Sequence, residues 1–126
     1  MTRCLVPAAV VLVALSACSS SPPGRLSAED EMRYGVQAGR RGYWQEALFR
    51  FERARALEPA NGELLNNLAV TQEALGRFDD ALATYKDALK AEPKNQNIRR
   101  NYARFAEFYS SYARGVRPKA DSNETR

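Results

Sequence analysis

Histidine and cysteine, two of the side chains that most often perform acid–base, nucleophilic or metal chemistry, are absent or scarce in this chain of 126 residues. Histidine is absent, which removes the commonest general base and metal ligand and excludes Ser-His and Cys-His catalysis. Two cysteines are present, Cys4 and Cys18. The neighbouring carboxylates Asp79 and Asp80 stand at a predicted helix start, where acidic side chains suit the helix dipole. We therefore expect no enzyme, no metal site and no bound cofactor.

Cys18 is the side chain for which the surrounding sequence predicts a reaction. Arg3 precedes an uncharged apolar run over residues 5–15, which is shorter than the roughly 20 residues of a membrane span and is typical of a signal peptide. The run ends in Leu15-Ser16-Ala17-Cys18, which resembles the lipobox of bacterial lipoproteins. The resemblance implies a diacylglyceryl group on the thiol, cleavage before Cys18 and acylation of the new amino group. The alternative is an ordinary secretory signal followed by a chance cysteine.

The lipoprotein resemblance also predicts where the mature chain resides. Residues 1–17 would be removed as the signal peptide, and with them Cys4, so that Cys18 carries a covalent lipid anchor. Ser19 follows the cysteine, and in this resemblance that implies the periplasmic face of the outer membrane, with the inner membrane as the alternative. Residues 18–26 are rich in serine and proline and form a lipidated, flexible linker.

Residues 28–95 contain one sequence pattern written twice. Glu46-Ala47-Leu48 recurs as Asp80-Ala81-Leu82, and Glu58-Pro59 recurs as Glu92-Pro93. The offset is constant, since 81 − 47 = 34 and 93 − 59 = 34. A period of about 34 residues is typical of a two-helix unit that stacks on copies of itself. Such units build curved surfaces for binding, which favours a binding function over catalysis.

Helical periodicity runs through this region, and no segment alternates as a strand would. We expect helices over residues 28–41, 44–57, 62–75, 79–91 and 96–114. Three side chains are suited to cap helix starts, namely Ser27 in a capping box with Asp30, then Asn61 and Asn95. Glycines and prolines mark the ends: Gly42, Pro59, Gly76, Pro93, Gly115 and Pro118. The tail over residues 118–126 is polar and is predicted to be disordered.

These residues resemble the tetratricopeptide repeat family over most of the mature chain. In units 28–61 and 62–95, the small and large consensus slots are filled by Tyr34, Gly35, Ala38, Ala47, Phe51, Ala54 and Pro59, then by Leu65, Leu68, Ala69, Ala81, Tyr85, Ala88 and Pro93. Glu31 and Gln72 depart from the pattern, because the family usually places large apolar or aromatic residues there. Glu31 predicts a frayed, solvent-facing start, and Gln72 predicts a slightly polar seam.

A third unit begins at residue 96 and stops after its first helix. Tyr102 and Ala103 fill the slots of Tyr34 and Gly35, but no second helix is predicted. The resemblance therefore implies an all-α domain over residues 27–117: two antiparallel hairpins and a capping helix, as a five-helix right-handed solenoid. The capping helix carries an aromatic stripe that favours core packing and leaves pairing with another subunit as an alternative: Tyr102, Phe105, Tyr109 and Tyr112, with Phe108 outside it.

The family resemblance places a partner in the concave face, which is lined by the first helix of each unit. The residues implied for this groove are Met32, Val36, Arg40, Asn66, Asn67, Val70, Glu73, Arg100, Arg104 and Phe108. The set is apolar at Val36 and Val70 and cationic at Arg100 and Arg104, whereas Asn67 stands where groove asparagines bond a peptide backbone. The alternative is that each of these residues is ordinary solvent-exposed surface.

The formal net charge of +4 is too small to indicate nucleic-acid binding. A late basic cluster is either a solvated face or a patch for an acidic partner or a nearby anionic membrane surface: Arg99, Arg100, Arg104, Arg114, Arg117 and Lys119. We expect a lipid-anchored adaptor that binds a protein segment during envelope assembly, such as the pilus or secretion machinery whose lipoproteins it weakly resembles. Two alternatives are a structural homodimer formed through the aromatic helix and an accessory factor for an envelope or peptidoglycan enzyme.

Overall fold

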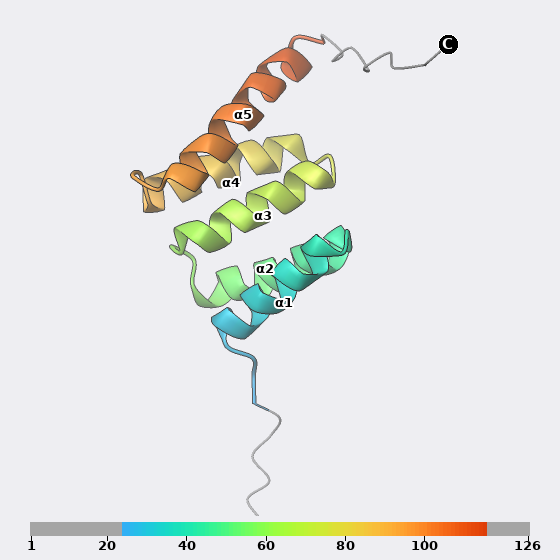
Figure 1. The fold of residues 1–126 in the computed structure, drawn as a ribbon, viewed down its shortest axis with the longest axis vertical. Coiled ribbons are helices and arrows are strands. Elements are labelled where there is room, and N and C mark those ends of the chain that lie inside the picture. The colour runs from blue at the N-terminus through green and yellow to red at the C-terminus, as the bar shows by residue number, and fades with distance from the viewer. Residues whose placement is uncertain (1–23, 116–126) are drawn as a thin grey trace, which may run out of the picture.

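The computed structural model describes residues 24–115, which form five α-helices and no strand (Figure 1). The helices are α1 (Ala28–Arg40), α2 (Trp44–Leu57), α3 (Gly62–Ala74), α4 (Phe78–Ala91) and α5 (Gln96–Ala113). The first four pair as the antiparallel hairpins α1–α2 and α3–α4, and α5 stacks on the second hairpin (Figure 1). The expected all-α solenoid of two hairpins and a closing helix is confirmed. The predicted signal peptide, Cys18 and the predicted disordered tail over residues 118–126 lie outside the described residues.

The helices begin and end within one residue of the sequence expectation, because the local signals act as anticipated. The Ser27 hydroxyl accepts a hydrogen bond from the Asp30 amide at 3.1 Å, which closes the predicted capping box with the Asp30 carboxylate. Asn61 caps α3 in the same way through the Leu64 amide at 3.0 Å. Gly42 and Gly76 end the first helix of each hairpin at φ values of +77° and +73°, which favour glycine.

Small residues allow the two helices of each hairpin to approach closely. Ala47 and Ala81 are completely buried at equivalent positions of α2 and α4. At Gly35, a Cβ atom would stand 2.6 Å from the Phe51 ring, so even alanine would force the aromatic side chain to move. The close helix contact therefore depends on the absence of a side chain at this position.

Large side chains fill the spaces between successive hairpins. Leu64 and Leu68 of α3 are fully buried against Phe51 and its neighbours in α1 and α2. On the other side, Phe105 of α5 is fully buried, and its ring centroid lies 5.3 Å from that of Tyr85 in α4. The expected core role of the aromatic stripe is confirmed for Phe105, on which the partly buried Tyr102 and Tyr109 pack, whereas Tyr112 is 51% exposed. Phe108, assigned outside the stripe, packs on the same cluster.

Glu31 corrects one expectation from the sequence. Its carboxylate is fully buried, where a frayed, solvent-facing helix start was expected. Arg53 Nε of α2 donates to Glu31 Oε1 at 2.6 Å, and Arg50 Nη1 donates to Oε2 at 3.1 Å. The two ion pairs compensate the cost of burying the carboxylate and fix the start of α1 on α2. The polar seam expected at Gln72 is present, since its buried Oε1 has no hydrogen-bond partner within residues 24–115.

Candidate partner-binding groove

Two hollows lie side by side along the face formed by α1, α3 and α5, which is turned toward the viewer in Figure 1. The first hollow, between α1 and α3, has a volume of about 270 Å³ and is lined by Gly35, Val36, Gly39, Arg40, Trp44, Phe51, Asn67, Val70 and Thr71. The second hollow, between α3 and α5, has a volume of about 360 Å³ and is lined by Val70, Glu73, Ala74, Phe78, Arg104 and Phe108. Val70 lines both hollows, so together they form one groove.

The second hollow repeats the construction of the first, one unit further along the chain. Val36 and Trp44 line the first hollow, and Val70 and Phe78 line the second, with offsets of 70 − 36 = 34 and 78 − 44 = 34. Each hollow therefore has a valine from one groove helix and an aromatic wall from the first turn of the following helix. The shared construction follows from the repeat, because equivalent residues of stacked units occupy equivalent places.

Two polar groups of the first hollow, the Arg40 guanidinium and the Asn67 side-chain amide, have no partners among the described residues. Arg40 is exposed in the last turn of α1 and forms no ion pair within residues 24–115. The half-buried Asn67 side chain likewise forms no hydrogen bond with that part of the chain. The hydrogen bond between Thr71 and Asn67 runs from the Thr71 hydroxyl to the main-chain oxygen of Asn67. The first hollow thus offers a free cation and a free amide beside an apolar floor.

The charged groups of the second hollow neutralise each other. Arg104 donates through Nη1 to Glu73 Oε1 at 2.7 Å and through Nη2 to Oε2 at 3.0 Å, a bidentate pair between α5 and α3. The Tyr85 hydroxyl of α4 donates to the same carboxylate at 3.1 Å. Burial, followed by the charge of Glu73, raises the pKa of Tyr85, and hydrogen bonding to Glu73 raises the pKa of Arg104. The carboxylate therefore joins three helices, and the cationic character expected at Arg104 is cancelled.

Seven of the ten residues predicted for the groove line one or both hollows: Val36, Arg40, Asn67, Val70, Glu73, Arg104 and Phe108. The structure places the other three elsewhere. Met32 packs against the first core cluster, and Asn66 is buried, with its Oδ1 accepting from Asn101 Nδ2 at 3.0 Å. Arg100 is exposed and donates to Asn97 of its own helix at 3.2 Å. The groove is consequently less polar and less basic than its sequence suggested.

The sequence analysis missed the aromatic walls of the groove, Trp44 and Phe78. Both are the first residue of the second helix in their hairpin, whereas only first-helix residues were assigned to the concave face. Their offset of 34 residues was a usable signal, because it matches the offset between Val36 and Val70. Aromatic residues directly after the glycine turn of each unit therefore belong to the groove.

Within residues 24–115, no group of three or more acidic, cysteine or histidine side chains is arranged to hold a metal ion. The helices of this same part of the chain are all too short or too polar to cross a membrane. The arrangement that the structure does provide is a shallow apolar groove with one free cation. Such a surface is suited to contact with another polypeptide rather than to bond-making chemistry.

Comparison with known proteins agrees with this geometry. A tetratricopeptide repeat profile matches residues 40–104, which is more than half of the chain. The chain is also 38% identical over 72 residues to the photosystem I assembly protein Ycf3 of Synechococcus sp. (strain WH7803). That alignment covers 55% of this chain and 42% of the relative, so the chain spans less than half of the relative's length. Repeat period, stacked hairpins and profile together show that the chain belongs to the tetratricopeptide repeat family, whose members serve as protein-interaction adaptors.

Proposed function

We propose that the protein is a lipid-anchored adaptor of the bacterial cell envelope that holds a segment of a partner protein in its groove. The observation that carries this proposal is the pair of equivalent hollows that share Val70. Repeated hollows along one face suit a polypeptide, because a polypeptide also repeats its side chains at regular intervals. The binding energy would come from burying apolar side chains against Val36, Val70, Trp44 and Phe78.

The relative supports a role in assembly. Its name assigns it to the assembly of photosystem I, and 72 residues of it align with this chain at 38% identity. We propose that this chain likewise assists the assembly of a larger complex, and that the complex belongs to the envelope, such as pilus or secretion machinery. The envelope assignment rests on the lipobox at Cys18.

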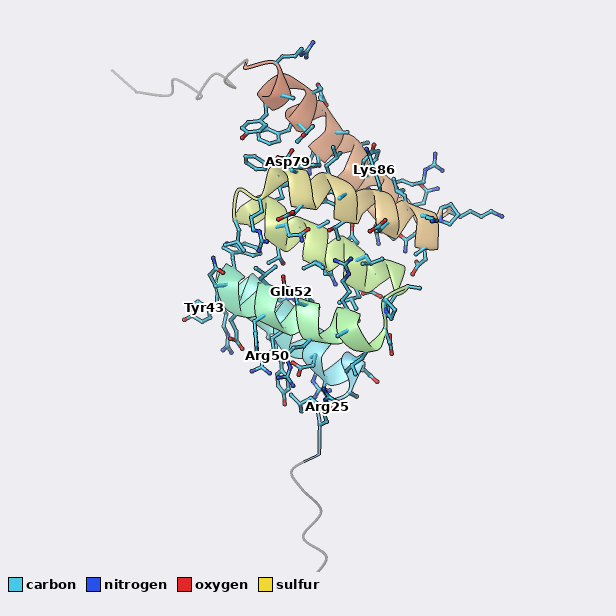
Figure 2. All side chains as sticks on the ribbon, turned by 180° about the vertical axis from the view of Figure 1, so that it is seen from behind. Arg25, Tyr43, Arg50, Glu52, Asp79 and Lys86 are labelled. Atoms are coloured by element: carbon cyan, nitrogen blue, oxygen red, sulfur yellow. The ribbon has the colours of Figure 1, made fainter. Side chains whose placement is uncertain are left out.

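Photo-crosslinking in living cells tests the groove. A benzophenone amino acid at Val70 should form adducts with an envelope protein, because Val70 lines both hollows. The matched control is the same amino acid at Lys86, an exposed residue on the opposite face (Figure 2). Equal adduct patterns at the two positions, or no adduct at Val70, would contradict a role for the groove.

The lipid anchor is tested separately. The wild-type chain should incorporate labelled palmitate and sediment with the outer membrane, whereas Cys18→Ser should do neither, since several acyl chains hold a domain durably at a bilayer. Retention of the label in the variant would show that Cys18 is not the lipidated residue. Wild-type protein recovered from the periplasmic fraction with an unmodified thiol would refute the anchor.

A further inference from the structure

We infer that the groove selects an extended segment with two large apolar side chains about two or three residues apart and a carboxylate beside the first of them. The inference rests on the proposed function and specifies the partner's chemistry. It follows from three features of the groove: the repeat of the hollow, the free amide of Asn67 and the difference in charge between the hollows.

The spacing of the two apolar side chains follows from the repeat of the hollow. Equivalent walls recur one groove helix further along, from Val36 and Trp44 to Val70 and Phe78. Neighbouring packed helices stand about 8–10 Å apart, and an extended chain advances about 3.3 Å per residue. Two side chains that enter successive hollows are therefore separated by about two or three residues.

The extended conformation follows from Asn67. Its side-chain amide lines the first hollow and forms no hydrogen bond with the rest of residues 24–115. An extended segment carries main-chain N–H and C=O groups that still need partners, whereas a helical segment has already paired its own. Asn67 can donate to and accept from an extended main chain as it crosses α3.

The position of the carboxylate follows from the difference in charge between the hollows. Arg40 at the first hollow has no acidic partner among the described residues, and the exposed Arg41 beside it adds charge of the same sign. At the second hollow, Glu73 already occupies Arg104 with two hydrogen bonds. A partner carboxylate gains attraction at Arg40 and none at the neutralised pair of Arg104 and Glu73. The acidic group of the partner therefore lies at the α1 end of the groove.

A phage-displayed library of random twelve-residue peptides, selected on the purified full-length chain, provides the probe. Enriched peptides should share two large apolar residues at a spacing of about two or three and an Asp or Glu next to one of them. Fluorescein-labelled copies of these peptides then give Kd by anisotropy. A consensus that is basic, or that has a single apolar residue, would overturn the inference.

Charge variants sharpen the test. Arg40→Glu should weaken binding of the acidic peptide about tenfold, and should favour a copy of the peptide in which the acid is replaced by lysine. Arg100→Glu is the matched control, because Arg100 is an exposed groove-helix arginine that lines neither hollow. Its Kd should stay within about twofold of the wild-type value. Equal effects of the two reversals, or no exchange of preference in Arg40→Glu, would refute the assignment to Arg40.

Failure of the inference and failure of the proposed function give different results. Val70→Glu places a charge in both hollows and should abolish peptide binding, with Trp44→Ala as a second variant and circular dichroism as the check on folding. If the Val70 and Trp44 variants lose binding while Arg40→Glu does not, the groove is a binding site and the charge assignment is wrong. If folded Val70 and Trp44 variants bind as well as wild type, the groove itself is refuted.

Discussion

The two hairpins fill one buried position in opposite ways. Glu31 in α1 and Leu65 in α3 are equivalent, since 65 − 31 = 34, and their exposed fractions are 0% and 2%. Leu65 packs with Ala88 and Ile98, the second of which comes from α5. Glu31 is instead held by arginines of α2. The same place in the fold therefore accepts either an apolar side chain or a charge.

The side chains across each hairpin determine which solution is possible. Arg50 and Arg53 face Glu31, and the equivalent residues of the second hairpin are Thr84 and Asp87, which cannot neutralise a carboxylate. The Arg50 and Arg53 side chains retain exposures of 27% and 46%, so they hold the buried acid while remaining hydrated. The fold fixes the location of this contact, whereas the facing residues fix its polarity.

Placing a buried carboxylate in the second hairpin, as in the first, should have the largest effect on stability. Leu65→Glu would bury a carboxylate with no arginine to receive it, and we expect the free energy of unfolding to fall by about 5 kcal/mol. Leu65→Ala, as the control, should cost about 3 kcal/mol through the cavity alone. Urea titration followed by circular dichroism measures both. A loss in Leu65→Glu no greater than in the alanine variant would show that the position does not discriminate against charge.

Removing the acid from the first hairpin should have an intermediate effect. Glu31→Ala deletes both ion pairs but leaves two partly exposed arginines that water can solvate, so we expect a loss of about 2 kcal/mol. Arg33→Ala is the control; it removes an exposed pair with Asp30 and a cation–π contact with Tyr34, and should cost less than about 1 kcal/mol. Similar urea midpoints for the two variants would contradict a structural role for the buried pairs.

A third exchange concerns the aromatic position shared by Phe51 and Tyr85, for which 85 − 51 = 34. Tyr85→Phe removes the hydroxyl that donates to Glu73 and should cost about 1 kcal/mol. Because folding raises the pKa of Tyr85, the wild-type chain should keep its full stability below the ordinary tyrosine pKa of about 10 and lose stability as the pH rises above it. Urea titrations at pH 8 and pH 11 should therefore show a larger loss for wild type than for Tyr85→Phe. An identical pH dependence in both proteins would contradict this role of the hydroxyl.

The smallest effect on stability is expected when the buried position of the first hairpin receives an apolar side chain, as in the second. The double variant Glu31→Leu with Arg50→Thr copies Leu65 and Thr84, and its stability should lie within about 1 kcal/mol of wild type. Glu31→Leu alone, which leaves Arg50 without its buried partner, serves as the comparison. A large loss in the double variant would mean that the ionic contact supplies stability that an apolar side chain cannot replace.

The sequence predicts the features that are local or periodic, such as helix ends and stacking. It predicts less well the features that depend on contacts between the two helices of a hairpin. Helix ends follow from Ser27, Asn61 and the glycine turns, and the stacking follows from the 34-residue offset. The burial of Glu31 was missed because its arginines are 19 and 22 residues away in sequence, on the facing helix.

The groove illustrates the same division. Val36, Val70 and Phe108 were found because they recur at known positions of the first helices. The side chains of Asn66 and Arg104 each form a hydrogen bond between α3 and α5. A pattern along one helix does not reveal such pairs. Free and neutralised charges become distinguishable only when the facing helix is in place.

The shared wall at Val70 has a consequence for how such a site changes in length. Because each recess needs two consecutive groove helices, three helices yield two recesses, and duplication of one 34-residue unit would create a third without disturbing the others. The groove can therefore lengthen only in whole units, by one hollow per duplication, while substitutions in one hollow can change its specificity separately. Val70 is the exception, because a substitution at this residue changes both hollows at once.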